Sequence, residues 1–182
     1  IANGQASSTL TLGNRSGTYT VTATSAGLIG SPITFTATAT VGAASRLTIA
    51  TEPSTPDTAG VPFRTQPVVR IEDVNGNLVT TDNSTVVTAT RLTGTGSLQG
   101  GLTATAVNGI ATFLNLSYNL AETITIRFTS VPALTPATSI SVVVRPAQAA
   151  RLTVQTQPSP AATAGVVFAP QPVVRIEDTF GN

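Results

Sequence analysis

A stretch of 32 residues occurs twice in this chain, and this duplication constrains the fold more than any other feature. Residues 46–77 align without a gap with residues 151–182 at an offset of 105, and 21 of the 32 positions are identical. The same offset aligns residues 1–45 with residues 106–150, with 9 identities in 45 positions. A period of this length that covers the whole chain indicates modules arranged in tandem.

The repeat divides the chain into three segments. We expect residues 1–45 to be the C-terminal part of one module, residues 46–150 a complete module, and residues 151–182 the N-terminal part of the next. Because both ends then fall inside modules and no initiator Met is present, we expect a piece of a longer polypeptide, with a proteolytic fragment as the alternative.

Threonine alternates with apolar residues in several places, and a period of two is typical of a half-buried β-strand. In residues 34–41 four Thr share one face while Phe35, Ala37, Ala39 and Val41 share the other. Residues 18–24 and 123–129 repeat this design. Further strands are expected near residues 46–51, 67–73, 85–92, 102–107, 110–116 and 138–144.

Seven or more short strands in 105 residues, without a helical period, predict an all-β fold: antiparallel Greek-key sandwiches of immunoglobulin type in tandem. Asn108-Gly109 predicts a type I′ hairpin turn, because both residues accept positive φ values. The connections before Arg46 and Arg151 are short and not Gly/Ser-rich, so consecutive modules should stack end to end as a rod. We expect five phenylalanines in the cores: Phe35, Phe63, Phe113, Phe128 and Phe168.

The composition argues against an enzyme. Cys, His and Lys are absent, which removes the imidazole base, the thiolate nucleophile, the lysine Schiff base and the nitrogen and sulfur ligands of metals. A net charge of +1 offers no basic patch for nucleic acid. No apolar run is long enough to cross a membrane, and residues 1–5 do not resemble a signal peptide. We therefore expect no catalytic, cofactor or metal residues, and no cofactor.

The duplicated residues resemble a known family. Leu47-Thr48-Ile49, Ala59-Gly60-Val61, residues 66–73 (QPVVRIED) and residues 108–113 (NGIATF) are similar to bacterial Ig-like repeats of the invasin and intimin (Big) type. Residues 3–6 with residues 17–24 resemble the other half of the same module. The resemblance implies a protein that is secreted or on the outer cell surface, in which tandem sandwiches carry an adhesive tip or pack into extracellular fibres. The chain has no lectin-like tip domain, so the resemblance implies no receptor.

The most suggestive polar cluster is residues 72–77 (EDVNGN), repeated as residues 177–182 (EDTFGN). Its carboxylates and amides can be arranged as oxygen ligands of Ca²⁺. The favoured alternative is a tight turn in which Asp73 caps backbone amides and Gly76 takes positive φ. Because Phe180 replaces Asn75 in the second copy, the turn is preserved while a calcium ligand is lost.

Arg70 and Glu72, like Arg175 and Glu177, are two residues apart on one strand face, with Val69 pointing inward. A solvent-side ion pair is the default interpretation, and an inter-module or inter-chain contact is the alternative. The adjacent carboxylates Glu72 and Asp73 face opposite sides of a strand, which disfavours glycoside hydrolysis. Three Asn-x-Ser/Thr triplets begin at Asn14, Asn83 and Asn115 and leave glycosylation as a minor hypothesis.

Together these features predict a structural segment of a long secreted or cell-surface bacterial protein, a stiff tandem Ig-like stalk or spacer. The alternative is a subunit of a self-assembling extracellular filament, whose incomplete ends are completed by neighbouring chains. The sparse charge on the sheet edges favours lateral association in that case. The expected partners are neighbouring repeats or other copies of the chain. A carbohydrate-binding or receptor-binding module is disfavoured because few aromatic residues are available.

Overall fold

The computed structural model describes residues 3–182, so the first two residues of the predicted segment 1–45 lie outside it. The described residues form strands joined by turns and loops, with no helix, and hence none that is long and apolar enough to cross a membrane. The strands are β1 (Gly17–Ala23), β2 (Ile33–Ala39), β3 (Arg46–Thr51), β4 (Asp57–Thr58), β5 (Val68–Glu72), β6 (Val86–Thr93), β7 (Leu98–Gln99), β8 (Thr103–Thr105), β9 (Ile110–Thr112), β10 (Ser117–Tyr118), β11 (Thr123–Val131), β12 (Ala137–Thr138), β13 (Val142–Arg145), β14 (Arg151–Thr156) and β15 (Val173–Glu177).

The central segment, residues 46–150, contains two main sheets. One has the strand order β4-β13-β11-β6-β8, with β12 also paired to β11, and the other has the order β3-β5-β9. Buried apolar and more exposed polar side chains alternate along the strands, as the sequence predicts. In β11, Ile124, Ile126 and Phe128 are buried while Thr123 and Arg127 are exposed. Apolar residues from both sheets form one buried cluster, which is consistent with a β-sandwich.

The buried cluster of the central segment confirms part of the predicted aromatic core. Phe63, Phe113 and Phe128 are buried, and the rings of Phe113 and Phe128 pack with their centroids 5.2 Å apart. The prediction is wrong for Phe35 and Phe168, which are 58 % and 46 % exposed. Each lies in a terminal segment whose apolar face is not covered by the described residues.

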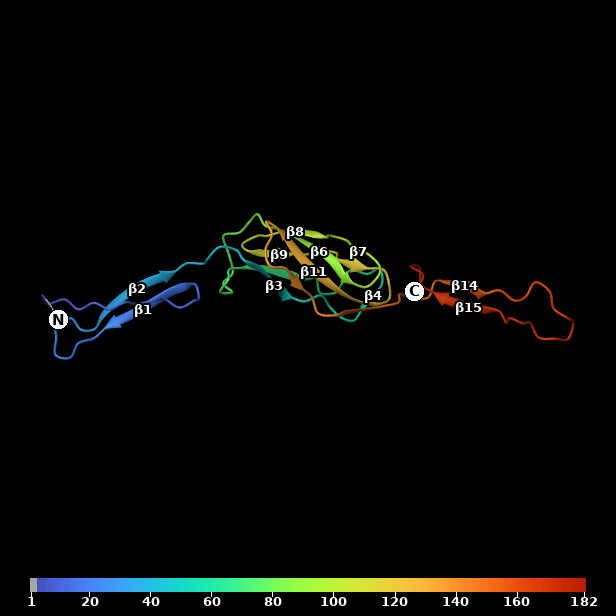
Figure 1. Ribbon diagram of the computed structural model, residues 1–182, viewed down its shortest axis with the longest axis horizontal. Coiled ribbons are helices and arrows are strands. Elements are labelled where there is room, and N and C mark those ends of the chain that lie inside the picture. The colour runs from blue at the N-terminus through green and yellow to red at the C-terminus, as the bar shows by residue number, and fades with distance from the viewer. Residues whose placement is uncertain (1–2) are drawn as a thin grey trace.

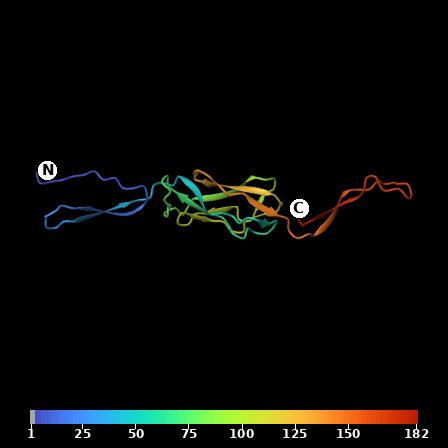
Figure 2. The same cartoon turned by 90° about the horizontal axis from the view of Figure 1, so that it is seen from below.

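The terminal segments are two-stranded hairpins. β1 pairs with β2 and β14 pairs with β15, both antiparallel. The β14–β15 register, with Arg151 opposite Glu177, reproduces that of β3–β5, where Arg46 lies opposite Glu72, including the same irregularity near the end of the first strand. The hairpins extend from opposite ends of the central segment, which gives the chain an elongated shape in both views (Figures 1 and 2).

The predicted strands agree with most of the observed strands, and the exceptions have local causes. Asn108 and Gly109 have φ values of 51° and 76°, as the predicted turn requires. The pairing stops after the bridge between Val107 and Ile110, because β8 and β9 then join different sheets. The expected strand 138–144 is interrupted between β12 and β13, and β4 pairs with β13 in parallel rather than antiparallel fashion.

Candidate inter-segment junction

The turn of residues 73–77 is organised by one carboxylate. Oδ1 of Asp73 accepts hydrogen bonds from the backbone amides of Asn75 and Asn77, at 2.9 and 2.8 Å. The Asn77 amide side chain donates to Oδ2 of Asp73 at 2.8 Å. Gly76 has a φ of 85°, which glycine adopts without strain. The predicted Asp-capped turn is therefore present, and it directs the Asn77 side chain away from its own sheet.

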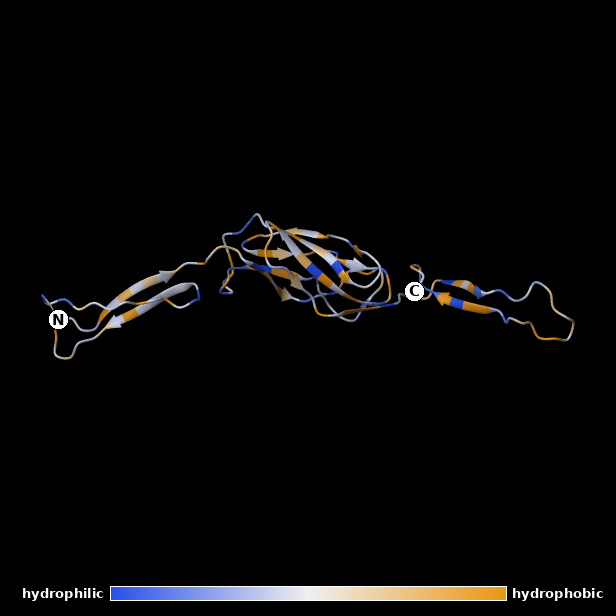
Figure 3. Ribbon diagram, viewed as in Figure 1, coloured by the Kyte–Doolittle hydropathy of each residue, from blue (hydrophilic) through white to orange (hydrophobic). Residues whose placement is uncertain are grey.

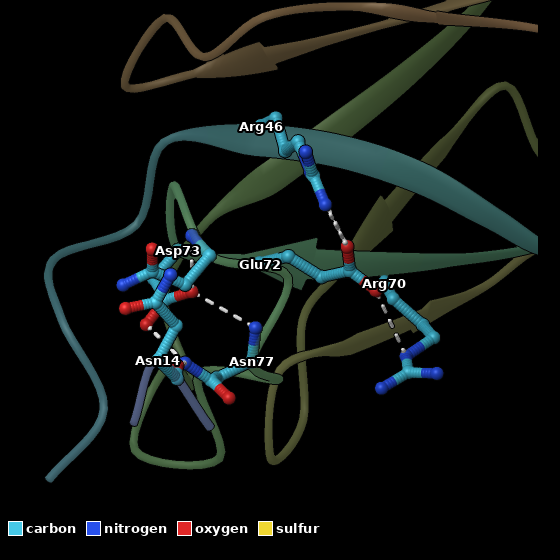
Figure 4. Close-up of polar contacts among 7 residues, drawn as sticks. Asn14, Arg46, Arg70, Glu72, Asp73 and Asn77 are labelled. Atoms are coloured by element: carbon cyan, nitrogen blue, oxygen red, sulfur yellow. Dashed lines mark hydrogen bonds and ion pairs between the residues drawn. The ribbon is translucent and has the colours of Figure 1, made fainter. Parts of the chain in front are cut away.

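The Asn77 side chain reaches the N-terminal segment. Its amide nitrogen donates to the carbonyl oxygen of Asn14 at 2.9 Å, and its Oδ1 accepts from the backbone amide of Ser16 at 2.9 Å. Oδ2 of Asp73 adds a third bond, accepting from the backbone amide of Gly42 at 2.9 Å. Figure 4 shows Asn14 beside Asp73 and Asn77, on the side of the turn away from Arg70. We call this set of three bonds the first junction.

The same three bonds recur between the central and C-terminal segments. The Asn182 side chain donates to the Asn119 carbonyl at 2.9 Å and accepts from the Ala121 amide at 2.8 Å. Oδ2 of Asp178 accepts from the Ala147 amide at 2.8 Å. Every donor and acceptor of this second junction lies 105 positions after its counterpart in the first. The later segment contributes side chains, and the earlier one contributes only backbone groups.

The hydrogen bonds of Asp73 determine its electrostatics. The hydrogen bond from the Asn77 side chain is the largest influence and, with the amides of Asn77, Gly42 and Asn75, it outweighs burial and lowers the pKa of Asp73 to about 2. At Asp178 burial opposes ionisation, but the hydrogen bonds from Asn182, Ala147 and Phe180 outweigh it and hold the pKa below its usual value. Both carboxylates are therefore ionised at neutral pH.

The calcium alternative does not fit this arrangement. A carboxylate has about four lone-pair positions, and four N–H groups donate to Asp73 as four others donate to Asp178. No electron pair faces outward for a cation, and the surrounding N–H dipoles repel one. Within residues 3–182, no three acidic side chains gather into a metal-binding group.

The predicted solvent-side pair of Arg70 and Glu72 is wrong in one respect, because Glu72 is only 7 % exposed. Glu72 lies between two arginines: Oε2 is 3.3 Å from Nη2 of Arg46, and Oε1 is 3.5 Å from Nε of Arg70 (Figure 4). Arg46 begins β3 directly after the connection, and the pairing of β3 with β5 places it over Glu72. Arg151 and Arg175 flank Glu177 in the same way, at 3.1 and 3.5 Å.

These arginines fix the position of the turn. A Cβ built on Gly76 would lie 2.9 Å from Nη2 of Arg46, and one built on Gly181 would lie 3.0 Å from Nη2 of Arg151. The guanidinium group thus packs on the glycine of the turn in both copies. The backbone amide of Ser45 also donates to the Glu72 carbonyl at 2.8 Å, which ties the connection to the strand before the turn.

The sequence identified one side of each junction and missed the other. The duplication marked Asp73, Gly76 and Asn77 as a turn but did not show what the turn contacts. Asn14, noted only as the start of a glycosylation triplet, supplies a backbone carbonyl to the first junction. The one available signal was that Asn14 and Asn119 are identical at the 105-residue offset, within a region where few positions match.

Comparison with known proteins adds no identification. The sequence matches no protein-family model and shows no significant similarity to a curated protein.

Proposed function

We propose that this chain is part of a rod of tandem immunoglobulin-like, Greek-key β-sandwich repeats of the bacterial invasin and intimin type. Its function is to hold a fixed spacing as a stalk of a secreted or cell-surface protein, and it catalyses no reaction. The observation that carries this proposal is the recurrence of the same three hydrogen bonds at both junctions. Because the same bonds form at both junctions, each repeat is held in the same orientation relative to the preceding repeat.

The chemistry of the junctions supports a structural role. The side chains that form them bond to backbone groups of the preceding segment, and the carboxylates are saturated by N–H donors. The connections, residues 40–45 and 146–150, are too short to let adjacent sandwiches swing freely. The resulting partners are the neighbouring repeats of the same polypeptide.

The proposal is tested by solution X-ray scattering of the 182-residue chain and of the double variant Asn77→Ala/Asn182→Ala. Each substitution removes two bonds to the preceding segment, so the variant should lose the extended, single-orientation scattering profile of the parent. Asn75→Ala is the control, because only the backbone amide of Asn75 contributes to the turn. Identical profiles for the parent and the double variant would contradict the proposal.

A second candidate is a filament subunit, in which a neighbouring copy, rather than the continuing polypeptide, covers the apolar face of the C-terminal hairpin. Ile176 and Leu152 are 71 % and 70 % exposed, whereas the corresponding Ile71 and Leu47 in the central segment are 0 % and 4 % exposed. Figure 3 shows this apolar character along the C-terminal hairpin. A second copy that covered this face would extend the rod into a filament. Light scattering that increases steeply with concentration supports the filament, and a monodisperse monomer at high concentration contradicts it.

A further inference from the structure

The turns of the two junctions differ at two positions, the second residue (Val74 and Thr179) and the third. The third residue is Asn75 in the first copy and Phe180 in the second, although Asp, Gly and Asn are retained on both sides. The backbone amides of Asn75 and Phe180 make the same bond to the turn carboxylate, at 2.9 and 2.8 Å. The turns therefore share one backbone conformation, and the side chain at the third position is free to vary.

The ring of Phe180 lies against Gly60 of the central segment. A Cβ built on Gly60 would lie 2.2 Å from both Cε2 and Cζ of the ring, a distance that no real side chain tolerates. Gly60 is fixed from the other side, since its amide donates to the Tyr118 carbonyl at 2.9 Å. The ring thus occupies space that is open because residue 60 has no side chain.

Gly165 shows that backbone conformation alone does not explain this contact. Residues 58–61 and 163–166 have the same sequence, Thr-Ala-Gly-Val, and both form a turn closed by a Val-to-Thr backbone bond, at 3.2 and 3.0 Å. Gly60 and Gly165 have nearly equal φ values of 75° and 79°. Any other residue is strained at both positions, but only at Gly60 does a ring from another segment approach.

A neighbouring position of the two junctions differs in polarity in the same way as the third position of the turn. At the first junction, the side chains at these two positions are the polar Arg15 and Asn75. Their counterparts at the second junction are Leu120, which packs against the buried cluster, and Phe180. A polar pair at the first junction is thus replaced by an apolar pair at the second.

We propose that the Thr58–Val61 turn is a docking surface for an aromatic ring from the following repeat. Phe180 packs on this surface at the second junction and restricts the motion of the C-terminal segment there, and we call this contact the lock. The residue at the third position of the turn thereby determines how rigidly each repeat is held. Phe180 keeps 40 % of its surface exposed, and the part of its ring that packs on Gly60 adds an aromatic contact to the three hydrogen bonds common to both junctions. This inference rests on the proposed tandem arrangement.

The test is a pair of spin-label distance measurements, which are clean because the chain has no native cysteine. Cysteines at the exposed positions Thr103 and Gln155 report on the second junction, and cysteines at Thr20 and Thr103 report on the first. We expect Phe180→Asn, which installs the residue of the first turn, to broaden the second distance distribution and leave the first unchanged. Phe180→Asn removes no contact within the central segment's core, so folding of that segment is preserved.

Gly60→Ala and Gly165→Ala form a matched pair, because both impose the same positive-φ strain. Only Gly60→Ala should broaden the distance across the second junction. Equal broadening by both variants, or a narrow distribution in Phe180→Asn, would overturn the lock. If Asn182→Ala broadens the distribution while Phe180→Asn does not, the lock is wrong and the proposed rod stands. If neither does, both proposals are wrong.

Discussion

The side-chain amide of Asn182 donates a 2.9 Å hydrogen bond to the backbone carbonyl of Asn119, 63 residues earlier in the chain. Asn77 and Asn14 have the same relationship and the same spacing. In each case a side chain of the later segment bonds to a backbone group of the earlier segment, and no side chain of the earlier segment takes part in the bond. The half of the repeat that supplies these side chains matches at 21 of 32 positions, and the half that supplies backbone groups matches at 9 of 45.

Side-chain substitutions at the backbone donors of the junctions should therefore be tolerated. Ser16→Ala and Ala121→Ser exchange the residues that the two junctions already use, so we expect a change in unfolding free energy within about 0.5 kcal/mol for each. Ala121→Pro removes the N–H group that donates to Asn182 and should loosen the second junction. Chemical denaturation and solution scattering measure the two effects. Loosening by Ser16→Ala equal to that caused by Ala121→Pro would contradict backbone recognition.

The junction should resist mild acid. The pKa of Asp73 lies at about 2, below its ordinary value of 3.8, mainly because the Asn77 side chain donates to the carboxylate. A lowered pKa means that the contribution of Asp73 is complete above pH 3.8 and is lost as the pH falls through about 2. The amide signal of Gly42, followed by NMR during acid titration, should shift in this window. In Asp73→Asn this transition should disappear, whereas a midpoint at or above 3.8 in the parent would contradict the assignment.

Phe128 and Phe35 should contribute differently to stability, because one is in the core and the other is exposed. Phe128 is fully buried and packs on Phe113, so Phe128→Ala should cost about 3–5 kcal/mol of unfolding free energy in the central segment. Phe35 is 58 % exposed, and Phe35→Ala should change it by less than about 0.5 kcal/mol. Urea denaturation measures both. A large effect of Phe35→Ala would show that its face is covered in solution.

Tyr118 links three parts of the central segment. The tyrosine is buried, its hydroxyl donates to Glu122 and accepts from the Gly96 amide at 2.5 Å, and its ring belongs to the buried cluster. Tyr118→Phe keeps the ring but removes the hydroxyl's bond to a charged carboxylate, which should cost about 1–3 kcal/mol of unfolding free energy, although Glu122 still accepts from the amides of Thr95 and Gly96. Thermal denaturation measures the loss. The double variant Tyr118→Phe/Glu122→Ala should lose less than the sum of the single variants, because each single variant removes the same Tyr118–Glu122 hydrogen bond.

The sequence predicted those features that depend on local patterns. The alternation of Thr with apolar residues located β1, β2 and β11 to within a residue or two of their observed ends, and Asn108-Gly109 identified its turn. Three of the four two-residue strands were missed, since β4, β7 and β10 are too short to show a period and form only through pairing with distant residues. The burial of Tyr118 was missed for a similar reason, because it depends on Glu122 and Gly96 coming together from separate loops.

The junctions were only half predictable. The Asp-Gly-Asn turns follow from the chemistry of their own side chains, which is local in the sequence. Their targets are carbonyl and amide groups, which every residue has, so no residue type marks them. The packing of Phe180 on Gly60 connects positions 120 residues apart, and nothing in either local sequence indicates it.

The central claim, that each repeat holds the backbone of the one before it, is tested most directly by amide hydrogen exchange at Ser16, Gly42, Ala121 and Ala147. These four amides donate to side chains of the following segment and not to their own sheets. The amide of Ala43 is the reference, as the described residues supply it no acceptor. We predict that all four amides exchange more slowly than Ala43, and that Asn77→Ala removes the protection of Ser16 while leaving that of Ala121. Exchange of all four at the rate of Ala43 would contradict the claim.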